Sequence, residues 1–128
     1  MTHNVIIALG TNIDKQLINN AYEELKKKYP DIKISNIIAT VPIGDKFQGK
    51  KFHNAIATLY TSETADKLIC RLKSIELLCG DSRKLREKGV VALDIDLLKH
   101  NNKIYHNADW ERNYIKRLMA EFIKPNCT

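Results

Sequence analysis

The stretch VVALDIDLL, residues 90–98, is an apolar run into which two carboxylates, Asp94 and Asp96, are set two residues apart. The run predicts a buried β-strand, and in a strand this spacing directs both carboxylates to one face. Two like charges side by side repel each other and lose hydration, so a fold retains them only with a cation or strong donors between them. Hard oxygen ligands in this arrangement suit Mg²⁺ that carries a polyphosphate. The alternative is that one Asp ends the strand while the other faces water.

Outward from this strand, hydrophobic patterns with the periods of strands and helices alternate along the chain. Strands are expected at 4–9, 32–40, 52–60 and 90–98, and helices at 14–28, 62–79 and 109–124. The order β-α-β-β-α-β, followed by a last helix, predicts the α+β class. It favours a ferredoxin-like split βαβ sandwich, in which helices pack on one face of an antiparallel sheet.

Punctuating residues set the expected ends of these elements. Ser62 is expected to cap the second helix and Gly80 to stop it. The segments 41–51 and 81–89 are polar or basic and are expected to be loops. The final helix carries an apolar side formed by Ile115, Leu118 and Phe122.

Length and charge limit the classes of protein that this chain can represent. A chain of 128 residues with 44% apolar residues fits one domain, 1–128, with a core of its own. Its 21 Lys and Arg against 15 Asp and Glu give a formal charge of +6. This excess favours phosphate-bearing partners, which are nucleotides, nucleic acid or an anionic surface.

The cysteines and the first apolar segment bear on the compartment. Cys70, Cys79 and Cys127 are an odd number without metal-finger spacing, so neither a disulfide framework nor a zinc site is indicated. A reducing cytoplasm is therefore expected. The apolar segment 5–9 is only five residues long and lacks a basic region before it, which predicts a strand and not a signal peptide or membrane span.

Five motifs in order resemble one family, the 6-hydroxymethyl-7,8-dihydropterin pyrophosphokinases. The segments 8–12 (ALGTN), 40–44 (TVPIG) and 52–55 (FHNA) are similar to the family's A-L-G-S-N, T-P-P-L-G and Y-L-N-A. The segments 75–77 (IEL, with Gly80) and 93–96 (LDID) are similar to its I-E-L-glycine and L-D-L-D elements. The resemblance covers about residues 4–98, and the family it points to moves pyrophosphate from ATP to a pterin alcohol in the folate pathway.

The resemblance implies a pterin pocket at one group of residues. Asn54 would read the polar edge of the pterin, which needs fixed donors and acceptors in a dry slot. Phe52 would stack on one face of the ring, and Tyr114, at a position similar to the family's R-x-F aromatic, would cover the other. Backbone groups near Thr40 and Ile43 would complete the pocket.

The resemblance also implies a nucleotide site. Asp94 and Asp96 would be catalytic and would hold two Mg²⁺ ions that bridge the ATP phosphates. Arg83 would share catalysis with them, since it lies in the basic loop before the aspartates. The expected nucleotide contacts are Lys73, Glu76, Arg83, His106 and Arg112.

Several of these residues have plainer interpretations. Phe52 and Tyr114 also fit core packing, His106 fits an exposed histidine, and Lys73 with Glu76 at i, i+3 fits a surface ion pair. Asn54 is harder to explain structurally, because strands disfavour Asn and a buried amide needs partners.

The chain departs from the family at two places that normally carry arginine. Asp81 stands just after the helix-ending glycine, and Val90-Val91 stands where the family has Pro-Arg. Loss of these arginines is expected to slow transfer, because charge neutralisation dominates phosphoryl chemistry. Arg83, Lys84, Arg86 and Lys88 in the same loop can compensate in part.

We therefore expect a cytoplasmic, monomeric, Mg²⁺- and ATP-dependent pterin pyrophosphokinase without a nucleic-acid or membrane partner. The alternative is a degenerate relative that binds pterin or nucleotide without catalysis, which Asp81 and Val91 favour. A nucleic-acid binder would need stacking aromatics along the sheet, and Phe52 is isolated.

Overall fold

The computed structural model describes residues 2–41 and 51–123, and strand β1 (His3–Thr11) lies at the centre of its sheet. Strand β1 pairs antiparallel with β4 (Phe52–Thr61) on one side and with β5 (Asp94–His100) on the other. The three long strands are apolar on both faces, so the sheet has to be covered on both sides. The expected strands at 4–9 and 52–60 are confirmed with slightly wider bounds.

Short strands complete the sheet at its edges. Strands β2 (Lys33–Ile34) and β3 (Ile38–Thr40) both pair with β4, and β6 (Lys103–Ile104) pairs with β5. The single strand expected at 32–40 is thus wrong, since the pairing is interrupted at Ser35. The Ser35 hydroxyl accepts the Ile56 N–H at 2.9 Å, a bond that a strand carbonyl would otherwise accept.

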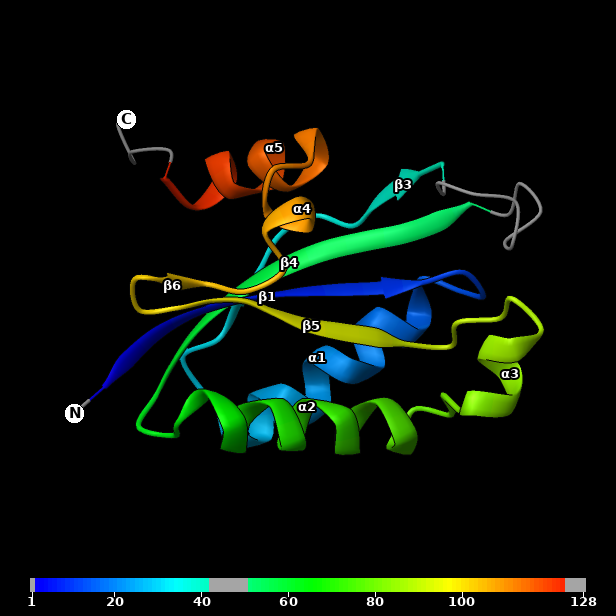
Figure 1. Cartoon of the computed structure of the whole chain (residues 1–128), viewed down its shortest axis with the longest axis horizontal. Helices are drawn as coiled ribbons and strands as arrows, with labels where there is room; N and C mark the ends of the chain where they lie inside the picture. The colour runs from blue at the N-terminus through cyan, green and yellow to red at the C-terminus, as the bar shows by residue number, and fades with distance from the viewer. Residues whose placement is uncertain (1, 42–50, 124–128) are drawn as a thin grey trace.

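Helices α1 (Gln16–Lys28) and α2 (Ala65–Leu78) cover one face of the sheet (Figure 1). The core between these helices and the sheet includes Ile7, Leu9, Ile18, Leu25, Leu68 and Leu72. Helix α1 joins β1 to β2 with β4 between them, and α2 leads from β4 toward β5 with β1 between them. The split βαβ arrangement expected from the element order is confirmed, as is the packing of these two helices on one face.

The opposite face is covered by α5 (Asn113–Ile123), with the short helix α4 (Asn107–Trp110) beside it (Figure 1). A second core joins Ile115 and Leu118 of α5 to Ile6, Ile56 and Leu98 of the sheet. The expected last helix at 109–124 therefore starts earlier and is broken into two. Its apolar side closes the face that α1 and α2 leave open, which adds a layer to the expected architecture.

The beginning of α2 and the loop that follows it differ from expectation. Thr64, not Ser62, caps α2, and its hydroxyl accepts the Lys67 N–H at 3.3 Å. Thr61 accepts the Glu63 N–H and so holds the chain in a turn, which delays the helix. Gly80 ends the helix region at φ 96°, as expected of a glycine stop. The segment 81–89 is not all loop, because Ser82 caps a short helix, α3 (Arg83–Glu87).

The segment 90–93 is not part of a strand, so the strand expected at 90–98 begins only at Asp94. Its backbone is held by side chains instead. The Val91 N–H donates to Asn12 Oδ1 at 2.7 Å, and the Ala92 N–H donates to Asp81 Oδ1 at 3.1 Å. The two aspartates therefore stand at the start of β5 and not at the end of a longer strand.

None of the helices in ranges 2–41 and 51–123 combines the length and apolarity needed to cross a membrane. Cys70 and Cys79 carry free thiols, whereas Cys127 lies outside the described residues. Most of the loop expected at 41–51, including Ile43, also lies outside them.

Candidate active site

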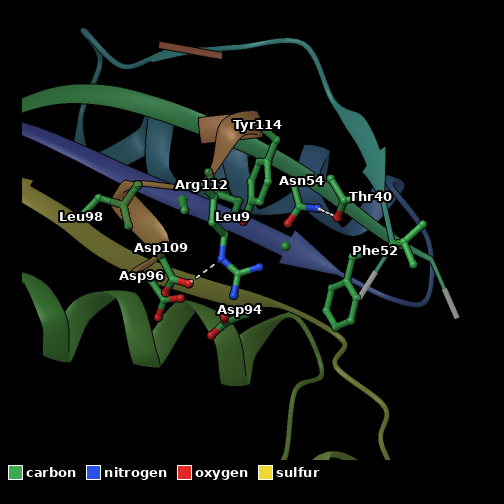
Figure 2. Close-up of a pocket in the computed structure, with 13 residues that line it drawn as sticks. Leu9, Thr40, Phe52, Asn54, Asp94, Asp96, Leu98, Asp109, Arg112 and Tyr114 are labelled. Carbon is green, nitrogen blue, oxygen red and sulfur yellow. Dashed lines mark hydrogen bonds and ion pairs between the residues drawn. The ribbon is translucent and has the colours of Figure 1, made fainter. Parts of the chain in front are cut away.

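A cavity of about 260 Å³ opens on the α5 face of the sheet, beyond the part that α5 covers (Figure 2). Its floor is made by β1, where Ala8 and Gly10 carry too little side chain to fill the space. The other lining residues are Leu9, Thr40, Val41, Phe52, Asn54, Asp94, Asp96, Leu98, Asp109, Arg112 and Tyr114. Residues from three further strands, β3, β4 and β5, and from the helices α4 and α5 thus converge above the floor that β1 makes.

The strand register explains why distant motifs meet here. Gly10 is paired with Asn54 on β4 and with Asp94 on β5, so these three positions form one row across the sheet. A Cβ atom on Gly10 would lie 3.2 Å from Asn54 Oδ1. The glycine therefore leaves room for the Asn54 amide, and the hydrophobic alternation of three strands directs all these side chains to the same face.

Asn54, Thr40 and Phe52 form one end of the cavity (Figure 2). Asn54 is 9% exposed, and its Nδ2 donates to the Thr40 hydroxyl across the β3–β4 pair. No described residue donates to its Oδ1, which lies over Gly10. A buried amide with one fixed donor and a carbonyl directed at the cavity is suited to reading a polar ring edge.

Phe52 and Tyr114 supply aromatic rings to the lining, from β4 and from the first turn of α5. Tyr114 also packs against the core of the α5 face, and burial raises the pKa of its hydroxyl. Its structural interpretation is thus correct, but the same ring lines the cavity.

Asp94 and Asp96 form the opposite, acidic end of the cavity together with Asp109 (Figure 2). The expectation that Asp94 and Asp96 share one face of a strand is confirmed, since the alternate residues Ile95 and Leu97 are buried on the other face. Burial and then the Asp94 carboxylate raise the pKa of Asp96 to about 7. Burial is the larger cause and the neighbouring carboxylate adds to it, so this end of the cavity disfavours a second full negative charge.

Arg112 lies at the same end, where its Nε donates to Asp109 Oδ1 at 3.1 Å. Sequence reasoning missed Asp109. The available signal was its position three residues before Arg112, in the region where the last helix was expected to start.

Arg86 of α3 approaches the acidic end from the loop. Its Nε donates to Asp81 Oδ2 at 2.7 Å, and its Nη2 lies 3.0 Å from the Leu93 carbonyl oxygen and 3.3 Å from Asp94 Oδ1. The second Asp81 oxygen accepts the Ala92 N–H. Asp81, at a position where the family pattern has arginine, therefore anchors both Arg86 and the chain that leads into β5.

Glu76 and Lys73 do not line the cavity. Glu76 is 5% exposed and lies beneath β5, where its Oε2 accepts the Ile95 N–H at 2.6 Å and the Lys73 Nζ at 3.3 Å. Burial raises the pKa of Glu76. Glu76 is thus more than a partner in a surface ion pair, because it supports the strand that carries the two aspartates. Its contact with a nucleotide stays a prediction.

The structure brings seven of the predicted site residues together around one cavity. They are Thr40, Phe52, Asn54, Asp94, Asp96, Arg112 and Tyr114. Arg83 and His106 are exposed and, with Lys73 and Glu76, are not among the lining residues. Ile43 lies outside the described residues.

Comparison with known proteins identifies one family. The family model described as 7,8-dihydro-6-hydroxymethylpterin-pyrophosphokinase (HPPK) matches residues 6–124. No curated protein matches the sequence. Among solved structures, a de novo designed protein with a ferredoxin fold is 19% identical, with 83% of this chain and 89% of that chain covered and a TM-score of 0.32.

Proposed function

The chain belongs to the 7,8-dihydro-6-hydroxymethylpterin-pyrophosphokinase family, and we propose that it transfers pyrophosphate from ATP to 6-hydroxymethyl-7,8-dihydropterin in a Mg²⁺-dependent reaction. The observation that carries the proposal is the arrangement of the cavity. A ring-reading amide and aromatic rings lie at one end, and paired carboxylates lie at the other. One cavity thus offers both chemistries that the two substrates need.

The acidic end fits magnesium bound to a nucleotide. The described residues contain no group of three or more His, Cys, Asp or Glu that could hold a metal ion by themselves. Magnesium, however, is usually bound by one or two carboxylates while phosphates and water complete its shell. Asp94 and Asp96 are such a pair, and a bound cation would offset the burial and the neighbouring Asp94 charge that raise the pKa of Asp96. When bound there, two Mg²⁺ ions would neutralise the phosphate charge that develops during transfer.

The residues of the chain would then position the two reactants. Asn54 would hold the pterin edge, and Phe52 and Tyr114 would contact the ring, which leaves the hydroxymethyl group directed along the cavity toward the aspartates. Arg112, paired with Asp109, would contact the phosphates. The pterin hydroxyl oxygen would form a bond to the β-phosphorus and lose its proton, while the bond from that phosphorus to the α-phosphate oxygen breaks and AMP leaves. Such positioning supplies much of the catalysis in phosphoryl transfer.

A second candidate is a relative that binds pterin or nucleotide without transfer. It is favoured by Asp81 and by Val91, whose side chain is only 6% exposed and cannot replace an arginine. Cytoplasmic location, a single domain and a monomeric state are further parts of the proposal, and each follows from the sequence expectations.

The test is to incubate the purified protein with ATP, Mg²⁺ and 6-hydroxymethyl-7,8-dihydropterin and to separate the nucleotides. The proposal expects AMP and no ADP from the wild type, and a loss of at least about 10²-fold for Asp96→Asn, because that carboxylate would hold the metal. Asp66→Asn, which changes an exposed carboxylate on α2, is the matched control and should match the wild type. Substrate binding without AMP formation would support the binding-only candidate.

A further inference from the structure

We propose that Arg86 is the phosphate-contacting arginine of this chain and that it competes with Mg²⁺ for Asp94. This inference rests on the proposed pyrophosphate transfer. Arg86 lies at a position that the family motifs do not mark, and it would take the place of the two missing family arginines.

The guanidinium of Arg86 is held in place by Asp81. Its Nε donates to Asp81 Oδ2 at 2.7 Å, and Asp81 is only 8% exposed. Asp81 in turn accepts the N–H groups of Ala92 and Leu93 at 3.1 and 3.5 Å. Because Asp81 is fixed by the backbone that enters β5, the guanidinium is fixed relative to the start of that strand.

The Arg86 guanidinium also contacts the acidic end of the cavity. Nη2 lies 3.3 Å from Asp94 Oδ1, at the acidic end of the cavity, and the Arg86 side chain remains 34% exposed. Nη1 donates to no residue in the described ranges. The guanidinium therefore has N–H groups to spare beside the carboxylate that is proposed to bind the metal, and its fork suits phosphate oxygens.

The other cations of the segment 81–89 are placed differently from Arg86. Within the described part of the chain, Arg83, Lys84 and Lys88 make no side-chain hydrogen bond or ion pair, and all three are exposed. Of the arginines and lysines on this segment, Arg86 alone contacts a cavity carboxylate in the described structure. The compensation expected from this loop is thus assigned to Arg86, and Asp81 supports it from the position of a missing arginine.

The contact with Asp94 has a second consequence. A guanidinium and a divalent cation favour the same carboxylate and repel each other, so Arg86 lowers the affinity of Asp94 for Mg²⁺ alone. Arg86 can give up Asp94 and still keep its bonds to Asp81 and to the Leu93 carbonyl. In the nucleotide complex, the Nη2 N–H freed from Asp94 would join Nη1 in contacting the phosphates, while the other Nη2 N–H stays on the Leu93 carbonyl.

The proposal predicts effects of opposite sign, which a merely structural residue would not produce. Arg86→Gln should bind Mg²⁺ alone about 2- to 5-fold more tightly, the size expected from loss of a partly exposed ion pair. It should also lower kcat for AMP formation by about 10²-fold or more, because a cation at the transferring phosphates is lost. Arg86→Lys should recover part of kcat, since lysine supplies the charge but not the fork.

The experiment measures Mg²⁺ binding by titration calorimetry without nucleotide, and then kcat and KM for ATP, in the wild type, Arg86→Gln and Arg86→Lys. Lys84→Gln removes one charge from the exposed side of the same helix and is the matched control, expected to equal the wild type in both assays. Thermal unfolding of each variant verifies that it is folded at the assay temperature.

Mg²⁺ affinity that does not rise in folded Arg86→Gln, or a kcat that does not fall, would overturn the proposal. A wild type that makes no AMP would refute the proposed transfer separately. In that case the Mg²⁺ titration, together with binding of the non-hydrolysable analogue α,β-methylene-ATP, still decides whether Arg86 competes with the metal and contacts phosphates. Equal analogue affinity in the wild type and Arg86→Gln would then refute the phosphate contact.

Discussion

Replacing Asp81 with alanine should destabilise the protein by about 3 kcal/mol, because one buried carboxylate anchors three donors. Loss of the charged bond from Arg86 Nε, at 2.7 Å, accounts for about 1 to 2 kcal/mol, a value reduced because the arginine is one third exposed. Loss of the acceptor for the Ala92 N–H adds about 1 kcal/mol or slightly more, since that donor is buried. The Leu93 bond, at 3.5 Å, adds little.

A domain of this size should then lose about 10 °C in Tm, at roughly 3 to 4 °C for each kcal/mol. The assay is thermal and urea unfolding followed by circular dichroism. Asp81→Asn should cost about half as much, because its amide oxygen still accepts the Ala92 N–H while the charge opposite Arg86 is lost. Asp31→Ala removes an exposed carboxylate and should unfold with the wild type. An Asp81→Ala variant within 0.5 kcal/mol of the wild type, roughly the limit of ordinary surface substitutions, would refute the anchoring role.

Three further predictions concern the cavity. Asn54→Ala should weaken binding of the pterin by about 1 to 3 kcal/mol in calorimetry, the usual cost of unpaired polar groups, and unchanged affinity would remove Asn54 from the pocket. Asp94→Ala and Asp96→Ala should each weaken Mg²⁺-dependent ATP binding, and titrations that match the wild type for both would contradict the metal assignment. Because the pKa of Asp96 is raised to about 7 in the folded protein from 3.8, the folded state holds the extra proton, and stability measured in EDTA should fall as pH rises from about 4 to about 7. In Asp96→Asn this fall should be smaller, and an identical pH profile would show that the group does not titrate in this window.

Much of the fold and of the cavity could be predicted because local patterns determine them. The alternation along β4 places Phe52 and Asn54 on one face, and the spacing of Asp94 and Asp96 does the same on β5. Once β1 separates these strands, the register brings Gly10 between Asn54 and Asp94 without further information. The family resemblance assigned these motif residues to substrate sites, and the strand register explains why they share one cavity.

The features that escaped prediction depend on long-range contacts. The apolar side of α5 was visible, but an amphipathic pattern does not state which sheet face it covers. A usable signal was present in the apolar side chains of the opposite sheet face. Ile6, Ile56 and Leu98 lie away from α1 and α2 and therefore need another element to cover them. Asp81 was interpreted only as a lost arginine, because nothing local indicates that its carboxylate reaches the backbone of Ala92, eleven residues away.

The most direct test of the central claim is the fate of the γ-phosphate of ATP. With ATP labelled at that position, Mg²⁺ and 6-hydroxymethyl-7,8-dihydropterin, the account predicts that the label appears in the pterin product and that one AMP forms for each labelled pterin. Label released as inorganic phosphate with ADP, or label that stays in ATP while the pterin is unchanged, would contradict it.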